Sequence, residues 1–106
     1  DCVMPTRNAR TGTVYTWNGM MNIKNKKWEK DFSPLDPAGS AEVDKMYSKS
    51  YVRHLLRANE ILALNILSTH NLAFYLDLVR EARKHITAGD FAEWKDKMVV
   101  PLSTKI

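Results

Sequence analysis

An Asn-Gly pair between two runs of β-prone residues is the feature that most constrains the fold of this chain. Residues 13–17 (TVYTW) precede the pair at positions 18 and 19, and residues 20–24 (MMNIK) follow it. A two-residue type I′ turn needs positive φ at both positions, which Asn and Gly tolerate best. The pattern predicts a β-hairpin, and because a lone hairpin is only marginally stable in water, we expect it to pack on the rest of the chain.

The start of the sequence combines an acid with two arginines. Pro5 has no N–H to donate to a sheet, so residues 1–10 (DCVMPTRNAR) predict the end of a buried strand that leads into a loop. In α/β barrels, acids at strand ends are often catalytic, and the loops beyond them often hold phosphate. Asp1 is therefore a candidate catalytic residue, with Arg7 and Arg10 in the loop that follows. From the residues alone, Asp1 fits an ordinary exposed acid equally well.

A linker rich in turn-forming residues separates the hairpin from a helical remainder. Residues 32–44 contain two prolines and a Gly-Ser pair. From Ser48 onward, apolar residues recur at three- and four-residue steps, which is typical of a helix. We expect an interruption of this helix between residues 59 and 65.

Two further helices are predicted after this interruption. The first begins with Ser68 as its N-cap and ends before Gly89. The second is short and begins at Asp90, and residues 99–102 form a tail against the body of the protein. The predicted buried stripe of the first consists of Leu72, Tyr75, Leu76, Val79, Ala82 and Ile86.

These elements predict an α+β chain made of two parts. Residues 1–37 form an N-terminal loop and a basic β-hairpin segment, and residues 38–106 form a mainly helical subdomain. The net charge of +4 lies entirely in the first third: residues 1–30 carry six basic and two acidic groups, and residues 31–106 carry ten of each. A polyanion such as nucleic acid is the natural partner of such a surface, although a solvated basic face has the same composition.

Trp28, Cys2 and the lengths of the apolar runs bear on the binding role and the cellular setting that the sequence predicts. Trp28 lies among lysines, where it could stack on a base or pin its loop onto the core, and we favour the pinning role. Cys2 is the only cysteine, which excludes an intramolecular disulfide and a cysteine-based zinc site and fits a reducing, cytoplasmic setting. With no apolar run of membrane-spanning length and no signal peptide, we expect no membrane partner.

Several motifs resemble the bacterial queuine tRNA-ribosyltransferases, also called tRNA-guanine transglycosylases. The first is DCVMPTRNARTG at positions 1–12, which resembles the signature of that family. The similarity continues in order through NIKN at 22–25, LDP at 35–37, YSKSY at 47–51, EIL at 60–62 and HNL at 70–72. The resemblance implies that the chain is the C-terminal piece of a longer TIM-barrel enzyme.

The resemblance also implies a reaction. The family replaces guanine at the tRNA wobble position with a 7-deazaguanine base, through a covalent bond between an aspartate and the ribose. Asp1 matches the aspartate nucleophile, and Arg7 and Arg10 match arginines that bind the tRNA anticodon loop. The second catalytic acid and the base pocket belong to the upstream part, so the fragment alone should be inactive. The intact enzyme is expected to be a cytoplasmic homodimer.

One departure from the family pattern concerns zinc. The family carries Cys-x-Cys-x-x-Cys with a His 26 residues further on, and the matching positions here are Gly39, Ala41, Asp44 and His70. Only the His is retained, so we predict that the structural zinc is absent and that the helical subdomain replaces the zinc-binding one. A hydrogen bond from His70 to Asp44 is expected in its place. Bacterial relatives that lack these cysteines form a subgroup.

Two other functions remain open from the sequence. The basic first third also suits a non-catalytic module that binds tRNA or another nucleic acid. The helical part could instead serve as a dimerisation unit, because the family's C-terminal region takes part in the dimer contact.

Overall fold

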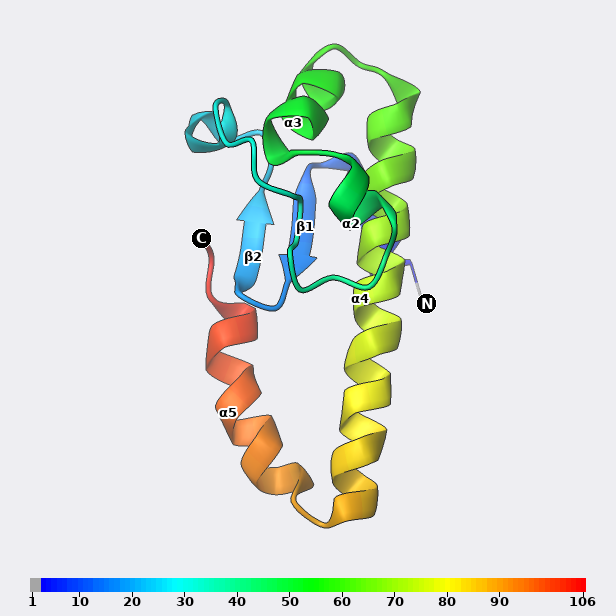
Figure 1. The fold of residues 1–106 in the computed structure, drawn as a ribbon, viewed down its shortest axis with the longest axis vertical. Helices are drawn as coiled ribbons and strands as arrows, with labels where there is room; N and C mark the ends of the chain where they lie inside the picture. Colours follow the sequence, from blue (N-terminus) through cyan, green and yellow to red (C-terminus); the bar gives the residue numbers. More distant parts are fainter. Residues whose placement is uncertain (1–2) are drawn as a thin grey trace.

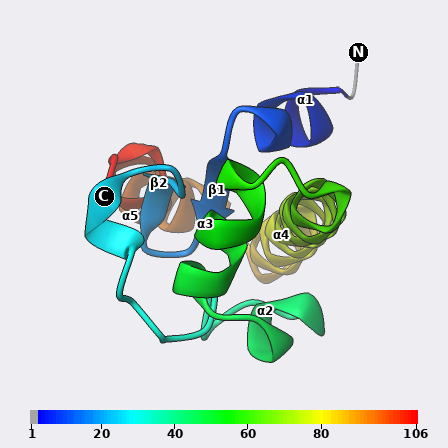
Figure 2. The ribbon, with the colours of Figure 1, turned by 90° about the horizontal axis from the view of Figure 1, so that it is seen from above.

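The computed structural model describes residues 3–106, and it has a small α+β architecture (Figure 1). One short helix precedes a two-stranded antiparallel hairpin, and the rest is mainly helical, so the predicted hairpin followed by a mainly helical part is confirmed. The elements are α1 (Met4–Arg10), β1 (Thr13–Thr16), β2 (Gly19–Asn22), η1 (Lys26–Trp28), α2 (Val43–Met46), α3 (Lys49–Arg57), α4 (Ile61–Ala88) and α5 (Phe91–Ser103). Viewed from above, α1 and α2 lie on opposite sides of the hairpin (Figure 2).

The segment around Pro5 is a helix, so the predicted strand exit and loop are wrong there. Pro5 lies in the first turn of α1, where its missing N–H costs nothing because the first helical N–H groups have no intrahelical acceptor. Arg7 and Arg10 lie in the last turn and are exposed. Cations at this end are favoured by the helix dipole.

The hairpin is confirmed, but the predicted type I′ turn at Asn18 and Gly19 is wrong: the turn lies one residue earlier, and neither of its residues has a positive φ. Thr16 pairs with Gly19, so the turn residues are Trp17 and Asn18. Gly19 has a φ of +136°, and a Cβ there would come within 2.5 Å of the Thr104 carbonyl oxygen. Glycine is therefore needed here both for this backbone conformation and because the C-terminal residues approach the backbone closely.

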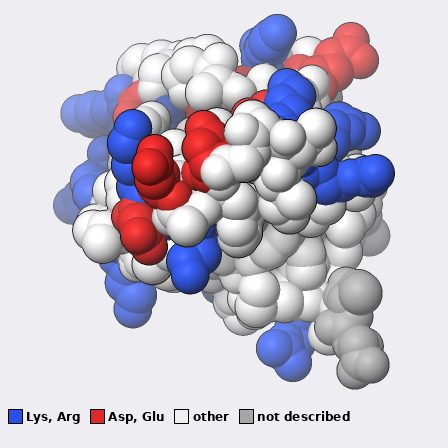
Figure 3. All heavy atoms as spheres, turned by 90° about the horizontal axis from the view of Figure 1, so that it is seen from below, with Lys and Arg blue, Asp and Glu red and all other residues white. Residues whose placement is uncertain are grey.

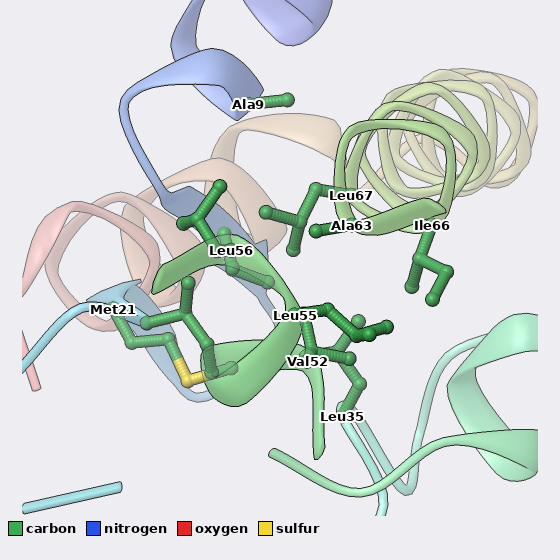
Figure 4. Close-up of a cluster of buried hydrophobic side chains, with 11 residues drawn as sticks. Ala9, Met21, Leu35, Val52, Leu55, Leu56, Ala63, Ile66 and Leu67 are labelled. Atoms are coloured by element: carbon green, nitrogen blue, oxygen red, sulfur yellow. The ribbon is translucent and has the colours of Figure 1, made fainter. Parts of the chain in front are cut away.

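The core draws residues from both sides of the linker. Val14, Met21 and Ile23 from the hairpin region meet Leu35 of the linker. Apolar side chains of α3 and the first half of α4 complete the cluster (Figure 4). They are Val52, Leu55, Leu56, Ala63, Ile66 and Leu67. The half-buried Trp28 packs against this cluster, which supports its predicted role of fixing the loop to the core.

The interruption between α3 and α4 is confirmed, but the predicted helix start at Ser68 is wrong. Asn59 has a φ of +57°, which ends α3, and α4 begins at Ile61. Ser68 lies inside α4, because packing of the first half of α4 on the hairpin outweighs the capping preference of a serine. The stop at Gly89 is confirmed, with a φ of +84° that glycine adopts readily.

The buried stripe predicted for α4 is also wrong. Leu72, Leu76, Val79 and Ile86 are exposed. The helix carries apolar residues on more than one face. The hairpin covers the face that also carries His70 and Asn71, because these two side chains bond to the hairpin backbone. The side chains buried on that face are Ala63, Ile66, Leu67, His70, Asn71 and Phe74. Beyond Phe74, α4 extends past the hairpin and lies beside α5 (Figure 1).

The last helix is longer than predicted, because α5 continues through Pro101 to Ser103. The chain then runs along the free edge of β2. The Met20 N–H donates to the Thr104 carbonyl and the Ile106 N–H donates to the Met20 carbonyl, each at 2.8 Å. The tail that lies against the body is therefore residues 104–106.

By length and composition, α4 could cross a membrane, contrary to the expectation that no segment was long and apolar enough. Its buried face, however, includes His70 and Asn71, whose polar groups are bonded to the hairpin. The first half of α4 is therefore part of the core of this domain.

Candidate functional site

The most polar part of the interior lies where α4 meets the free edge of β1, and we call it the polar junction (Asp44, His70, Asn71 and the Tyr15 backbone). All three side chains are at most 1% exposed. The edge of a strand carries N–H and C=O groups that need partners. Side chains of α4 supply these partners, so the hairpin is held to the helix by specific bonds as well as by packing.

His70 links the linker to the hairpin. Its Nδ1 bonds to Asp44 Oδ1, and its Nε2 lies 2.7 Å from the Tyr15 carbonyl oxygen. The Tyr15 carbonyl and an ionised Asp44 both accept hydrogen bonds, so this arrangement favours a proton on each ring nitrogen. Burial alone would lower the pKa of His70. The hydrogen bond and charge of Asp44, together with the Tyr15 carbonyl and the charge of Asp36, outweigh burial and raise it.

The four positions that match the family's zinc ligands come together at this junction. The second oxygen of Asp44 accepts from the Ala41 N–H at 3.2 Å. A Cβ at Gly39 would overlap the Asp44 carboxylate, so glycine makes room for it. The sequence-based expectation that His70 bonds to Asp44 is confirmed.

These residues do not fit a structural zinc ion. Such sites need four ligands, usually thiolates with His. Gly39 and Ala41 have no ligating side chain, and the one nitrogen and one oxygen that remain are bonded to each other. Across residues 3–106, no three His, Cys, Asp or Glu side chains lie close enough together to hold a metal.

We therefore expect the protein to fold without zinc. Elemental analysis of chelator-free protein should find well under one zinc per chain, and EDTA should leave the melting temperature unchanged, because the Asp44–His70 pair stabilises the junction. Stoichiometric zinc lost on replacing His70, or unfolding by EDTA, would contradict this.

Asn71 completes the junction, and sequence reasoning missed it. Its Oδ1 accepts from the Tyr15 N–H at 3.2 Å, and its Nδ2 donates to the carbonyls of Thr13 at 3.0 Å and Pro5 at 3.1 Å. One side chain thus fixes both β1 and the start of α1. The available signal was an amide one residue from His70, between Leu67 and Phe74 on an otherwise apolar face.

Asn71→Ala should lower the local unfolding free energy by about 3 kcal/mol, because each buried polar group left without a partner costs about 1–3 kcal/mol. Hydrogen exchange of the Tyr15 amide would measure this, since that amide donates to Asn71. Asn65→Ala is the matched control, as Asn65 is exposed on the same helix. Equal protection in both variants would show that Asn71 does not hold the hairpin.

The candidate RNA-binding residues lie on the surface, in α1 and in the segment after β2. Arg7 and Arg10 are exposed on α1, and Lys24, Lys26 and Lys27 are exposed after β2. At Gly12 (φ +89°), a Cβ would meet the side chains of Asn22 at 2.9 Å and Lys24 at 3.2 Å. Glycine therefore lets the end of α1 approach Lys24. Asp1 lies outside the described residues.

The opposite end of the molecule has a different charge pattern. Seen from below, acidic and basic side chains are interspersed (Figure 3). Along α4, Arg80 bonds to Asp77 at 3.2 Å and Lys84 bonds to Glu81 at 3.1 Å. This agrees with the zero net charge of residues 31–106, and it leaves the excess positive charge in the first third.

Comparison with known proteins gives consistent matches. The family model described as queuine tRNA-ribosyltransferase matches residues 1–102. The chain is 54% identical over 95 residues, 90% of its length, to the queuine tRNA-ribosyltransferase of Nitratidesulfovibrio vulgaris (strain DP4). It is 47% identical over all 106 residues to that of Aquifex aeolicus (strain VF5), and 47% identical over 96 residues, 88% of its length, to that of Bacillus velezensis.

The aligned region is a limited part of these relatives. The chain spans 25% of the Nitratidesulfovibrio protein, 28% of the Aquifex protein and 25% of the Bacillus protein, about a quarter of each. Within this quarter, the matched residues include α1, the hairpin and the polar junction. The chain belongs to the queuine tRNA-ribosyltransferase family.

Proposed function

We propose that this chain is the C-terminal part of an enzyme that exchanges guanine at the tRNA wobble position for a 7-deazaguanine base. The observation that carries the proposal is the family match over residues 1–102, which includes the segment with Asp1, Arg7 and Arg10. The relatives are named for a ribosyltransferase activity on tRNA, which is a pentosyl transfer. Both the tRNA and the purine-like base are therefore proposed substrates.

In the proposed reaction, Asp1 is the nucleophile. Its carboxylate attacks the ribose C1′, the bond from C1′ to guanine N9 breaks, and guanine leaves. The incoming base then attacks C1′ and releases the carboxylate. A carboxylate suits both steps because the transition state resembles a cation and the ester is resolved readily, as in retaining glycosidases. The second acid and the base pocket would lie elsewhere in the enzyme, so residues 1–106 alone should be inactive.

Arg7 and Arg10 are proposed to hold the anticodon loop. Guanidinium groups bind phosphates in a bidentate manner and stack on unpaired bases. Both arginines are exposed on one short helix, and Asn71 fixes the start of that helix by bonding to the Pro5 carbonyl. Lys24, Lys26 and Lys27 would add a weaker positive field.

Arg7→Ala plus Arg10→Ala should weaken tRNA binding and flatten its salt dependence. Each lost phosphate contact lowers the slope of log affinity against log salt by about one unit, so we expect a change of about two. Binding of tRNA by the full-length protein at several salt concentrations would measure it.

The matched control for this change removes the same charge elsewhere. Lys95→Ala plus Lys97→Ala neutralises two exposed cations of α5 and should leave the slope nearly unchanged. If the arginine variant kept the slope of the unmodified protein, both arginines would be structural and the proposed tRNA contact would be wrong.

The assembly and setting of the enzyme are also proposed. Residues 38–106 would be the subdomain that stands in place of a zinc-binding one, and residues 1–37 would carry the catalytic-loop end and the basic hairpin. A homodimer is supported by exposed apolar side chains that line adjoining clefts, namely Phe32, Met46 and Tyr51. A cytoplasmic location fits the single cysteine.

A further inference from the structure

A second polar surface lies beside α1, on the face of the hairpin opposite Val14 and Met21; Tyr15 on this face is largely buried against Phe74 and Tyr75. The strand register places Tyr15 opposite Met20 and Thr13 opposite Asn22, so these four side chains share one face. A cleft of about 410 Å³ opens on this face. The hairpin is its floor, α1 forms one wall, and the C-terminal residues 105–106 form the other.

Uncharged amide groups dominate the polar lining of this cleft, which we call the amide cleft (Asn8, Tyr15, Met20, Asn22, Asn25 and Lys105). Asn8 donates from Nδ2 to the Tyr15 hydroxyl at 2.6 Å, which leaves its carbonyl oxygen available. Asn22 accepts from the Lys24 N–H at 3.0 Å, which leaves its amide N–H groups available. Asn25 is exposed and can offer both a donor and an acceptor.

This combination suits a flat heteroaromatic ring. Met20 is half-buried, and its polarisable thioether next to Tyr15 gives an apolar floor against which a ring can pack. Asparagine amides match the paired donors and acceptors along a base edge, as in their recognition of adenine. The volume also lies within the range of small-molecule sites.

The charge around the cleft favours a nucleotide over a neutral ring. Lys105 is the one charged side chain that lines it, so no carboxylate within the described lining would repel a phosphate. Asn8 follows Arg7 directly on α1, which places the cleft next to a proposed phosphate contact. Unpaired bases in RNA loops are typically splayed out, stacked and read along their edges.

We propose that the amide cleft binds one unpaired base of the RNA loop that Arg7 and Arg10 hold. The base packs over the half-buried Met20 next to the largely buried Tyr15, Asn22 and Asn25 bond to its edge, and Lys105 faces its phosphate. This assignment rests on the proposed function, and it adds a contact that reads sequence to arginines that hold the backbone.

The test uses the full-length protein and a set of RNA hairpins that differ by single bases in the loop. Asn22→Ala plus Asn25→Ala should reduce discrimination at one loop position by about tenfold, because a good pair of base-edge contacts contributes that order of selectivity. The salt slope should stay unchanged, because no charge is removed. Asn18→Ala, an exposed amide at the hairpin turn, is the matched control.

The double variant could also disturb the local fold, because Asn22 accepts from the Lys24 N–H. Asn25→Ala alone is therefore a second variant that leaves this bond intact. It should lose part of the same discrimination with an unchanged melting temperature. Discrimination equal to that of the unmodified protein at every loop position, in both variants, would overturn the amide cleft as a base site. That result, with a salt slope still reduced by the arginine variant, would leave the proposed function standing. If the unmodified protein did not bind tRNA at all, the proposed function itself would be refuted.

Discussion

Asp44→Ala should lower the free energy of unfolding of the polar junction by about 3–5 kcal/mol, because removing one partner of a buried ion pair leaves the other without compensation. Asp44 and His70 are each 1% exposed, so water cannot replace the lost carboxylate. The Ala41 N–H also loses its acceptor. Hydrogen exchange of the core amides of α4, or thermal unfolding of the full-length protein, would measure the change.

The matched control is Asp96→Asn, which alters an exposed acid of α5 and should change stability by less than about 0.5 kcal/mol. Asp44→Ala combined with His70→Leu should cost less than the sum of the single changes. Each single change leaves the other residue's charge buried without a partner, whereas the double change removes both charges together, so part of the cost disappears. Additive effects would show that Asp44 and His70 do not interact.

The same pair predicts a dependence on pH. The pKa of His70 is raised above its usual 6.5, chiefly because Asp44 outweighs the effect of burial, with smaller contributions from the Tyr15 carbonyl and Asp36. A raised pKa stabilises the fold fully below the unfolded value of about 6.5, and this contribution is lost as the pH rises through the folded value. Stability should therefore fall with rising pH above about 6.5, and this fall should be much smaller in Asp44→Ala.

The sequence predicted correctly those elements that depend on residues close to one another in the chain. The break near Asn59 and the stop at Gly89 follow from residues that tolerate positive φ, and the hairpin follows from two β-prone runs close together in sequence. The turn was misplaced by one residue because Gly19 serves a contact with Thr104, which is 85 positions away in sequence. Sequence spacing holds no information about such an approach.

The errors in α1 and α4 have a similar origin. Pro5 fits both a broken strand and the first turn of a helix, and packing against α4 decides between them. The periodicity of α4 identified apolar positions but could not determine which face meets the hairpin. That choice follows from His70 and Asn71, whose bonds to β1 depend on where the backbone of Tyr15 lies.

The candidate site was predictable to the extent that it matches family motifs. Gly39, Ala41, Asp44 and His70 were identified by position, and the structure brings them together. Asn71 and the amide cleft were not identified, because their roles depend on distant segments meeting: Pro5 with α4 in one case, and Lys105 with the hairpin in the other.

The most consequential residue for the proposed chemistry is Asp1. Its replacement by Asn keeps size and shape but removes the anionic oxygen that would attack the ribose carbon. The full-length Asp1→Asn protein should therefore form no covalent adduct with tRNA, whereas tRNA binding and its salt slope should be largely retained, because the arginines are intact. Asp96→Asn again serves as a control and should form the adduct normally.

The decisive measurement is denaturing electrophoresis of the full-length protein after incubation with its tRNA. The expected result is a denaturation-resistant protein–tRNA band with unmodified protein, its disappearance when the incoming base is added, and no band with Asp1→Asn. A band of equal intensity with Asp1→Asn would show that another residue is the nucleophile. Binding of tRNA without any band or base exchange by the unmodified protein would identify it as a non-catalytic tRNA-binding module and contradict the proposed enzyme.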